Sequence, residues 1–485
     1  MNKKIAFLPR NQFHINLFLK VGDYLKKNHS CDIVFIRELE KDNNYNVFEF
    51  EKEMEKIFHS VDVSYEGLEK IQKKYSEANF MRAIYSEREF NFFPEYFNYK
   101  HVSYDFQMRY LVSCIKVFES WLDKNDVTAV VSELLTGLPD SVLYEICKVR
   151  NIQYISIRSS KMTPGVIVCD KYYDEPKNMR DVYDDFIING VPEDLLKKAK
   201  EHIFSIRNKA EKPAYMQLTK KKFKLFTLQR ANTFIRRAGK EKILTSSISL
   251  YQHPILNPAR WALHRFNNIR KTKQSFSKWF ATEISSDDKY LVYPLHYEPE
   301  ASTLIRAFHF SDQMCVIKQI IKVLPLGVKL VVKEHGGNQG YRKNNFYREL
   351  YYFPNVILVP PEYDGRKLIT NSLGLITLTG RMGWEALTMN KPVIAFGKSF
   401  WTLFKQVKKP KSWRELKNNL QEICGKNKDD TLDQASNFID NDLIIYAAAY
   451  ISQVYEANFV LGTDDLYDDL NVKRIAETLY KEVVL

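Results

Sequence analysis

Two hydrophobic patterns alternate over the first third of the chain. Short apolar runs of strand length stand at 4–9, 31–36, 127–133 and 152–159. Between them, apolar residues recur every three or four positions at 11–27 and 139–151, which is the spacing of an amphipathic helix. Strands that alternate with helices predict a parallel sheet with helices on both faces. Residues 1–165 are therefore predicted to form a Rossmann-like domain.

The same alternation returns more strongly from residue 286. Strand-like runs stand at 289–295, 328–335, 355–360, 373–379 and 391–397. Helix-like segments stand at 311–325, where Ser311 is the expected N-cap, and at 344–353, 365–372 and 382–390. The pattern predicts a second Rossmann-like domain over 286–430.

The remaining segments show no clear strand pattern. Residues 166–285 are predicted to be mainly helical, and residues 431–485 to form C-terminal helices. The predicted fold class is α/β, with two Rossmann-like domains and a helical basic segment between them. Parallel sheets of this kind bind ligands at the carboxyl ends of their strands, so the residues at those ends are the candidates for function.

The net charge of +13 is concentrated in that basic segment. Residues 207–280 hold 18 Lys or Arg and two acidic residues, a net of +16, which leaves −3 for the rest of the chain. Aromatic residues stand between the charges. A basic, aromatic-rich segment suits an anionic membrane surface or a lipid-linked acceptor. It also suits nucleic acid or a solvated helical linker, and contact with the inner-membrane surface is favoured over these, with no nucleic-acid partner expected.

Composition narrows the class of protein further. Hydrophobic residues make up 45% and charged residues 27% of the 485 residues, values ordinary for a globular protein. No apolar run is long enough for a membrane span, and the N-terminal apolar run is too short for a signal peptide. The six scattered cysteines indicate reduced core thiols in a cytoplasmic protein, with no disulfide framework and no zinc site. No Asp-x-Asp motif ends a strand, so neither a metal nor a separate cofactor is expected.

Polar residues follow two predicted strands of the second domain directly. His296, Glu298, Glu300, Ser302 and Thr303 follow the first of them. The second closes with Lys333, Glu334 and His335, and a glycine-rich loop then leads to Arg342. A buried strand has no structural need for such residues, whereas a ligand site does. His335 is a candidate phosphate donor or general acid, and Glu298 and Glu300 are candidates for binding a sugar or nucleotide or for orienting the loop.

The stretch TLTGRMGWEALTMNKPVIAFG, residues 377–397, places a glycine turn between a strand and a helix. Gly380 and Gly383 would let the backbone turn sharply and approach a ligand. A helix starting near Gly383 would direct free N–H groups toward an anion, and Arg381 would add a fork of donors. Glu385 is placed to accept hydrogen bonds from ribose hydroxyls. A tight turn with a helix-favoured glutamate is the structural alternative.

The strand ends of the first domain offer fewer candidates. They carry Asn11, His14, Glu133, Arg158 and Ser159. Glu133 ends a buried strand and is the best candidate for a base on the acceptor side. The alternative is a carboxylate that favours the N-terminus of the following helix.

Four motifs in this order resemble the capsule polysaccharide biosynthesis family. They are YPLHYEPEAST, VVKEHGGNQGYR, NVILVPP and TLTGRMGWEALTMNKPVIAFG, and they cover about residues 286–400. The family is related to bacterial Kdo transferases and has the GT-B glycosyltransferase architecture. The resemblance implies that the second domain binds a nucleotide-sugar, CMP-Kdo in related enzymes, and that a glycan or lipid-linked acceptor enters from the first.

The resemblance also implies roles for particular residues. His335 matches the histidine of a His-Pro motif that meets donor phosphate, and Glu298 matches a Gln-Pro-type position on the donor side. Thr379, Gly380, Gly383 and Glu385 match the donor loop. Gly336 stands where proline is usual, and Arg381 stands where a small hydroxyl residue is common. Arg381 would favour an acidic sugar or pair with Glu334 or Glu385.

The predicted function is thus a glycosyltransferase of bacterial surface polysaccharide synthesis, cytoplasmic and peripheral at the inner membrane. The predicted catalytic residues are Glu133 and His335, and the predicted donor-binding residues are Glu298, Glu300, Ser302, Lys333, Glu334, His335, Thr379, Gly380, Arg381, Gly383 and Glu385. Two alternatives on the same fold are a nucleotide-sugar epimerase and a polyol-phosphate transferase. A third is a catalytically silent scaffold of a polysaccharide assembly complex.

Overall fold

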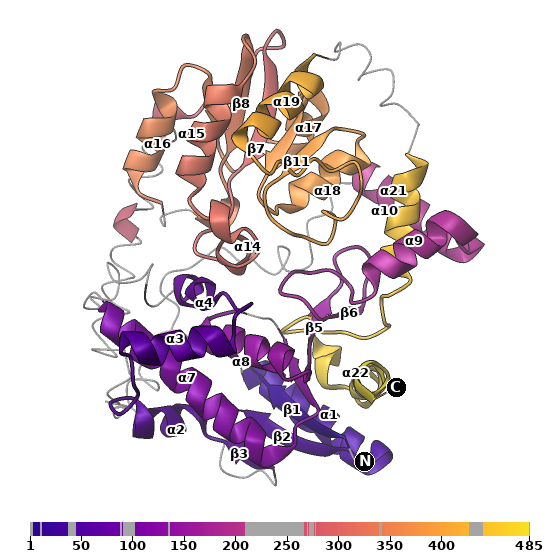
Figure 1. The fold of residues 1–485 in the computed structure, drawn as a ribbon. Helices are drawn as coiled ribbons and strands as arrows, with labels where there is room; N and C mark the ends of the chain where they lie inside the picture. Colours follow the sequence, from indigo (N-terminus) through magenta and orange to yellow (C-terminus); the bar gives the residue numbers. More distant parts are fainter. Residues whose placement is uncertain are drawn as a thin grey trace. The chain divides into compact units, whose positions relative to one another are not determined.

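The structure is a computed structural model, drawn in Figure 1. It describes residues 3–9, 12–36, 45–87, 90, 102–133, 136–208, 266–268, 270, 276, 278–338, 342–425 and 440–484. The described chain divides into two units. Unit 1 holds the described residues up to Lys177 and from Gln453 onward, and unit 2 holds those from Asn178 to Ser452.

Unit 1 is built on a six-stranded sheet with the order β3-β2-β1-β4-β5-β6. The strands are β1 (Lys4–Leu8), β2 (Asp32–Ile36), β3 (Asn46–Phe48), β4 (Ala129–Ser132), β5 (Gln153–Ser159) and β6 (Val166–Cys169). The strands β1 to β5 pair in parallel, and β6 pairs antiparallel with β5. The strand β6 corrects the prediction that residues 166–285 are mainly helical without a clear strand. It pairs antiparallel with β5 and so lies outside the alternation of strands and helices.

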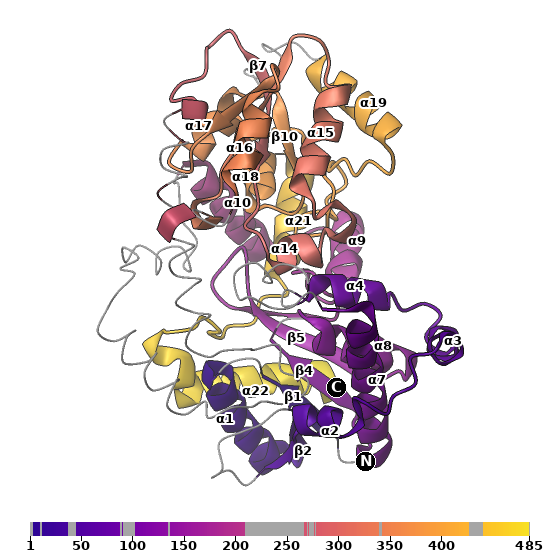
Figure 2. The same cartoon turned by 90° about the vertical axis from the view of Figure 1, so that its left-hand side faces the viewer.

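Alternate residues of the unit 1 strands face two separate cores. Ile5 and Phe7 face a core with α1 (Gln12–His29) and α22 (Asp469–Val484), whereas Ala6 and Leu8 face a core with α7 (Tyr104–Asn125) and α8 (Leu138–Val149). The second core also receives residues from α2 (Phe50–Ile57) and α4 (Phe80–Ser86), with α3 (Tyr65–Lys74) beside it. Figure 2 shows the C-terminal helix α22 beside α1. Burial on both faces is the reason these strands are nearly continuous in apolar residues.

Unit 2 is built on a five-stranded parallel sheet with the order β11-β10-β7-β8-β9. The strands are β7 (Lys289–Pro294), β8 (Val328–Lys333), β9 (Val356–Val359), β10 (Gly374–Thr377) and β11 (Val393–Ala395). One face packs against α15 (Gln313–Val323), α16 (Asn344–Tyr351) and α19 (Trp413–Cys424). The two α/β units, each with a predominantly parallel sheet, confirm the predicted fold class.

The helix α18 (Arg381–Thr388) packs against β10 and β11, with α17 (Gly365–Asn371) beside it. Helix α10 (Glu193–Asn208) contacts α18 and α21 (Asn441–Ile451), and α9 (Met179–Asn189) contacts α21. The short α14 (Ala301–Leu304) follows β7. The two described C-terminal helices therefore belong to different units, α21 to unit 2 and α22 to unit 1. The domain boundaries predicted from the sequence stay predictions.

One predicted helix cap is wrong. Ser311 has helical backbone angles and closes the preceding 3-10 turn. Asp312 is the N-cap of α15, and its side chain accepts a hydrogen bond from the Cys315 backbone N–H at 3.0 Å. The N-cap requires a non-helical backbone, which Asp312 has and Ser311 lacks.

Candidate functional site: the carboxyl edge of the unit 2 sheet

The strand order of unit 2 reverses between β7 and β10. The chain runs from β7 outward to β8 and β9, and then returns to the other side of β7 with β10 and β11. In open parallel sheets this reversal leaves a crevice at the carboxyl ends of the two central strands, where ligands bind. The segments that follow β7 and β10 therefore form the candidate site.

A hydrogen bond from Thr379 to His296 joins these two segments. The Thr379 backbone N–H donates to Nε2 of His296 at 3.1 Å, and both residues are buried. Since a backbone N–H only donates, Nε2 of His296 carries no proton and the imidazole is neutral. Burial lowers the pKa of His296 to about 3. The buried Gln313 amide fixes the His296 backbone through two hydrogen bonds, from His296 N at 2.8 Å and to His296 O at 3.3 Å.

This contact predicts a dependence of stability on acid. The pKa of His296 is about 3 in the folded chain and about 6.5 in an unfolded chain. Between these values only the unfolded state binds the proton, so the free energy of unfolding falls as the pH falls. The glutamine amide oxygen in His296→Gln can still accept the hydrogen bond from Thr379 but does not titrate. Between pH 7 and pH 5 we therefore expect the free energy of unfolding to fall by about 2 kcal/mol less in the variant than in the wild-type chain.

Denaturant unfolding of both proteins at pH 7 and pH 5 measures this difference. His202 is an internal control. Burial lowers its pKa to about 4, and because it is present in both proteins its contribution to acid sensitivity cancels in the difference. An identical acid sensitivity of the wild-type chain and the variant would contradict the assignment.

The turn after β10 presents an open helix N-terminus. Gly380 is the N-cap of α18, and no side chain caps the helix. The Gly380 N–H donates to Oγ1 of Thr377 at 3.2 Å, and the Thr379 hydroxyl donates to the Ser302 carbonyl at 3.2 Å. The N–H groups of Arg381 and Met382 have no partner within the helix, and both residues are partly exposed. The positive end of α18 is thus accessible to an anion.

Gly383 does not have the role that its position in the sequence suggested. The helix begins at Arg381, so Gly383 lies inside it and is buried. A Cβ atom at Gly383 would lie 2.4 Å from the Trp401 ring. The glycine is required for helix packing against Trp401, and the prediction that it lets the backbone approach a ligand is replaced by this packing role.

Arg381 and Glu385 lie one helical turn apart on α18. Nε of Arg381 is 3.8 Å from Oε1 of Glu385, and the two side chains are 29% and 26% exposed. Burial raises the pKa of the Glu385 carboxyl, and the charges of Arg381 and Arg366 oppose that rise. Of the pairings considered from the sequence, this structure contains the one with Glu385. The long distance and the partial exposure leave the guanidinium accessible to a ligand.

Two side chains at the carboxyl end of β8 form hydrogen bonds within the protein. Lys333 donates from Nζ to the Pro361 carbonyl at 2.6 Å, and burial lowers the pKa of Lys333. The Glu334 side chain is 0% exposed, and its Oε1 accepts from the His335 backbone N–H at 2.6 Å. Lys333 and Glu334 are therefore bonded within the protein, and their predicted contacts to a donor stay predictions.

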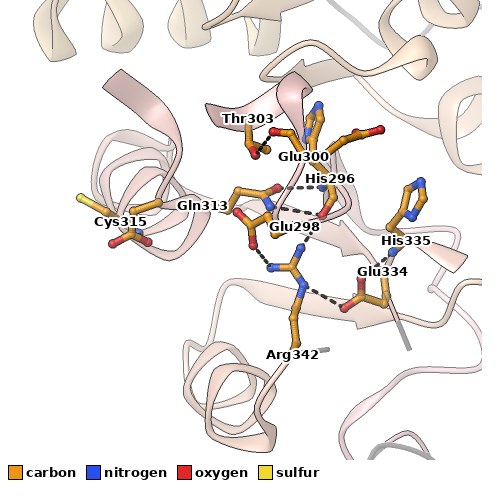
Figure 3. A network of polar contacts seen from close by, with 10 residues as sticks. His296, Glu298, Glu300, Thr303, Gln313, Cys315, Glu334, His335 and Arg342 are labelled. Atoms are coloured by element: carbon orange, nitrogen blue, oxygen red, sulfur yellow. Dashed lines mark hydrogen bonds and ion pairs between the residues drawn. The ribbon is translucent and has the colours of Figure 1, made fainter. Parts of the chain in front are cut away.

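His335 holds one ring nitrogen inward and one outward. The Gly337 N–H donates to Nδ1 of His335 at 3.1 Å, so Nδ1 is the acceptor and the proton of the neutral ring is on Nε2. Burial lowers the pKa of His335, which favours this neutral form. Figure 3 shows the His335 ring directed away from Arg342, as is the Glu300 side chain. His335 can thus offer an N–H donor to a ligand at the end of β8.

The two glutamates of the segment after β7 differ in their contacts. Glu298 pairs with Nη1 of Arg342 at 2.8 Å. Glu300 is exposed and accepts a hydrogen bond from the Ser302 hydroxyl, while its carbonyl accepts from the Thr303 hydroxyl at 3.0 Å. Of the two predicted glutamates, Glu300 is the one placed to reach a ligand.

Several residues that hold the site together were not predicted as site residues. They are His296, Gln313, Asn338, Arg342 and Thr377. His296 and Arg342 could be noticed in the sequence beside the strand ends. Gln313 lies on a helix and Thr377 within a strand, and neither position carries a signal of its own.

The corresponding strand reversal in unit 1 lies between β1 and β4. Glu133 follows β4 and forms an ion pair with Nδ1 of His14 on α1, and both side chains are buried. The His14 ring stacks on Phe459 with ring centroids 4.5 Å apart. Glu133 is thus one half of a buried His–Glu pair at this reversal.

Two other strand-end candidates of unit 1 are accounted for differently. Arg158 is buried and donates to Asp174 at 2.7 Å and to Ser156 at 3.0 Å, which is a structural role. Asn11 lies outside the described residues.

The fold and site together define two Rossmann-like units, one of which presents an open helix N-terminus and a histidine donor at the carboxyl edge of its sheet. Residues 199–424 match the model of the family described as capsule polysaccharide biosynthesis protein. This match confirms the resemblance to the capsule polysaccharide biosynthesis family that the motifs at 286–400 indicated.

Solved structures with similar folds include two Kdo transferase domains of KpsC from Thermosulfurimonas dismutans. The beta Kdo 2,7 transferase is 11% identical, with 76% of this chain and 89% of that chain covered and a TM-score of 0.36. The beta Kdo 2,4 transferase is 14% identical, with 67% and 79% covered and a TM-score of 0.34. The UDP-GlcNAc 2-epimerase of Methanocaldococcus jannaschii is 11% identical, with 93% and 99% covered and a TM-score of 0.28. No curated protein matches the chain. At these TM-scores none of the likenesses bears on function.

Three further findings concern classes of site considered from the sequence. No helix in the described ranges is long and apolar enough to span a bilayer. Within the same ranges, no group of three or more His, Cys, Asp or Glu side chains is arranged to hold a metal ion. All six cysteines are free, but Cys315 is exposed, which corrects the prediction that all are core thiols: it lies on the outer face of α15.

Proposed function

We propose that the chain is a glycosyltransferase of bacterial surface polysaccharide synthesis. It transfers a sugar from a nucleotide-sugar donor, with a CMP-Kdo-like donor favoured, to a glycan or lipid-linked acceptor. The observation that carries the proposal is the carboxyl edge of the unit 2 sheet, where an uncapped helix N-terminus and Arg381 follow β10, the outward Nε2–H of His335 follows β8, and these two strands lie on either side of β7. The family match over residues 199–424 supports the same class of function.

The two units differ in the charged groups at the N-terminus of the helix that follows the strand reversal, which is α8 in unit 1 and α18 in unit 2. In unit 1, the N-terminal region of α8 already has carboxylates: the Leu138 N–H donates to Glu87 at 3.0 Å, and Asp140 lies in its first turn. Both helices have a glycine N-cap, but α18 begins with an arginine and has no acidic residue in its first turn. Phosphate is favoured at an open helix N-terminus and repelled by carboxylates. This contrast supports the proposal that unit 2 binds the donor phosphate.

In the proposed reaction, the fixed donors of unit 2 stabilise the charge that develops on the leaving nucleotide. The N–H groups at the start of α18 and Nε2–H of His335 are held in place before the reaction, so they need no reorganisation during it. Arg381 has a planar fork that fits a phosphate or a sugar carboxylate. The exposed Glu300 and the carboxylate of Glu385 are assigned to the donor's hydroxyl groups.

The acceptor side of the proposal rests on Glu133 in unit 1. A carboxylate that accepts a proton from an attacking hydroxyl needs a fixed orientation, and the ion pair with His14 supplies one. Neither a metal nor a separate cofactor enters this proposal. The sugar, the acceptor and the linkage are to be identified by assay.

Calorimetric titration with CMP, UDP and GDP tests the donor assignment. We expect CMP to bind, and Arg381→Ala to weaken that binding about tenfold or more, because a charge-assisted hydrogen bond contributes about 1.5–3 kcal/mol. Arg381→Lys should lie between, since it keeps the charge and loses the fork. Arg348→Ala, an exposed position on α16, is the matched control. Binding of UDP or GDP alone would keep the nucleotide site and change the donor, and binding of none of the three would contradict the proposal.

The basic segment 207–280 is proposed to dock the protein on the inner membrane. Most of it lies outside the described residues, so the proposal rests on its charge of +16. Each basic residue near an anionic surface contributes about 1 kcal/mol. Replacing Lys220, Lys221, Lys222, Arg236 and Arg237 with glutamine should abolish sedimentation with anionic phosphatidylglycerol vesicles. Unchanged sedimentation would remove membrane docking from the proposal, and salt-sensitive retention of RNA would replace it with nucleic-acid binding.

A further inference from the structure

A buried arginine joins the ends of β7 and β8 (Figure 3). The Arg342 side chain is 5% exposed, and its Nη1 donates to Glu298 at 2.8 Å. Its Nη2 donates to the His296 carbonyl, and its Nε lies 3.4 Å from Oε2 of Glu334. One guanidinium thus contacts both the segment after β7 and the segment after β8.

Further groups fix the plane of this guanidinium. The buried Asn338 amide, oriented with its oxygen toward Arg342, accepts from Nε at 2.6 Å and donates to the Glu298 carbonyl at 3.3 Å. The Phe346 ring of α16 lies under the guanidinium, 4.7 Å from its central carbon. A planar group with donors in fixed directions is needed to meet all these partners, which lysine does not provide.

Burying these charged groups costs desolvation free energy, which a purely structural role does not require. The guanidinium of Arg342 and the carboxylate of Glu334 are buried, and the Glu298 side chain is 24% exposed. Burial raises the pKa of Glu298, and the charge of Arg342 opposes the rise. Buried ion pairs of this kind are often replaced by apolar residues without loss of stability. A role in orienting a neighbouring functional group accounts for a buried charged cluster at the ligand edge of the sheet.

The group that the cluster orients is His335. Oε2 of Glu334 faces Arg342, and Oε1 accepts from the His335 backbone N–H at 2.6 Å. The Gly337 N–H donates to Nδ1 of the ring, and Gly337 lies in the same loop as Asn338. Both the backbone and the tautomer of His335 therefore depend on the loop that Arg342 holds.

We propose that Arg342 is a positioning residue that, through Glu334 and Asn338, holds His335 with its Nε2–H directed toward the donor. The inference rests on the proposed donor site, and it changes the predicted roles of Glu298 and Glu334 from donor contacts to supports of Arg342. His335 remains the residue that touches the ligand.

The charges around His335 give this proposal a readout that needs no substrate. Glu334 and Glu300 raise the pKa of His335, whereas Arg342 and Lys333 lower it, and burial has the largest lowering effect. The neighbouring His296 is neutral. Removing the charge of Glu334 should therefore lower the pKa of His335, and removing the charge of Arg342 should raise it. These shifts test whether the two charges act on His335, and the tautomer of His335 tests whether the loop holds its ring.

The experiment titrates the ¹⁵N-histidine-labelled full chain by NMR, with the His335 signals identified by their absence in His335→Gln. In the wild-type chain we expect a protonated Nε2 and an unprotonated Nδ1. Glu334→Gln should shift the pKa of His335 downward and Arg342→Gln should shift it upward. Arg348→Gln, at an exposed position on α16, is the surface control and should leave the pKa unchanged. If Arg342→Gln does not fold, Glu334→Gln and the isosteric Glu298→Gln decide the question.

A kinetic arm separates positioning from binding. With the donor identified by the nucleotide titrations, Arg342→Lys should lower kcat about 10- to 100-fold with a smaller change in KM, as a displacement of about 1 Å would. An unmoved pKa of His335 in Glu334→Gln, or shifts of the same sign in both charge-removing variants, would overturn the proposal. Loss of the Nε2–H tautomer of His335 in Arg342→Gln, in a chain that binds none of CMP, UDP and GDP, would uphold the positioning and reject the donor site.

Discussion

Replacing His335 with alanine is expected to lower kcat/KM by about 10²- to 10³-fold. The outward Nε2–H of His335 is a preorganised donor at the end of β8, and the loss of one such donor from a site that stabilises developing negative charge has an effect of this size. The measurement is a steady-state assay with the nucleotide-linked sugar that the titrations select. CMP affinity should fall less than kcat/KM, because the charge on the leaving phosphate is greatest in the transition state.

His335→Gln provides the matched control for this prediction. The glutamine amide nitrogen can take a position near that of Nε2, so it should recover part of the lost rate. The pH dependence that arises from the His335 ring should disappear in both variants, because neither side chain titrates. Full activity of His335→Ala would remove His335 from the site, and an equal loss in both variants would show that the ring does more than donate a hydrogen bond.

Replacing Gly383 with alanine is expected to destabilise unit 2 by about 1–3 kcal/mol, the usual effect of overpacking a filled core. The added Cβ would lie 2.4 and 2.5 Å from two atoms of the Trp401 ring, and both residues are completely or almost completely buried. The lower entropy of an unfolded chain with alanine favours folding by at most about 1 kcal/mol, so the clash outweighs it. Denaturant unfolding followed by tryptophan fluorescence measures the change.

Gly380→Ala is the control, because it tests the same turn without the same clash. Its backbone φ is −63°, which any residue adopts, and its nearest neighbour to a new Cβ is Oγ1 of Thr377 at 3.0 Å. We expect a smaller loss of stability than for Gly383→Ala. If the two variants were equally stable, the packing role of Gly383 would be wrong.

The sequence determined the two sheets and their order of elements. Strand-length apolar runs alternate with helix-period segments, and each such segment of the second domain is a strand or helix within a few residues of its predicted bounds. Parallel pairing follows from this alternation, since a helix must carry the chain back to start the next strand. Polar residues directly after apolar strands then identify the ligand edge, because the carboxyl ends of parallel strands share it.

Short elements and element boundaries were predicted less well. The strands β3 and β6, of three and four residues, were not predicted. The strand β6 pairs antiparallel with β5 and therefore lies outside the alternation of strands and helices. The start of α18 was placed at Gly383, because a glycine pair looks the same whether it forms a turn or lets an aromatic ring approach a helix. Only the position of Trp401, which follows β11, decides between these roles.

The tertiary structure alone decided which polar side chains are available to a ligand. Glu298, Glu300 and Glu334 are equivalent by residue type and by place after a strand, yet Arg342 engages two of them and leaves Glu300 exposed. The pairing of Thr379 with His296, 83 positions apart in the chain, likewise depends on strand order. Hydrophobic periodicity depends on residues that are close in the sequence. The partner of a buried charge depends on segments that come together only when the strands pair. For this reason the sequence located the edge where the site lies, and the packing of the loops around Arg342 assigned the roles within it.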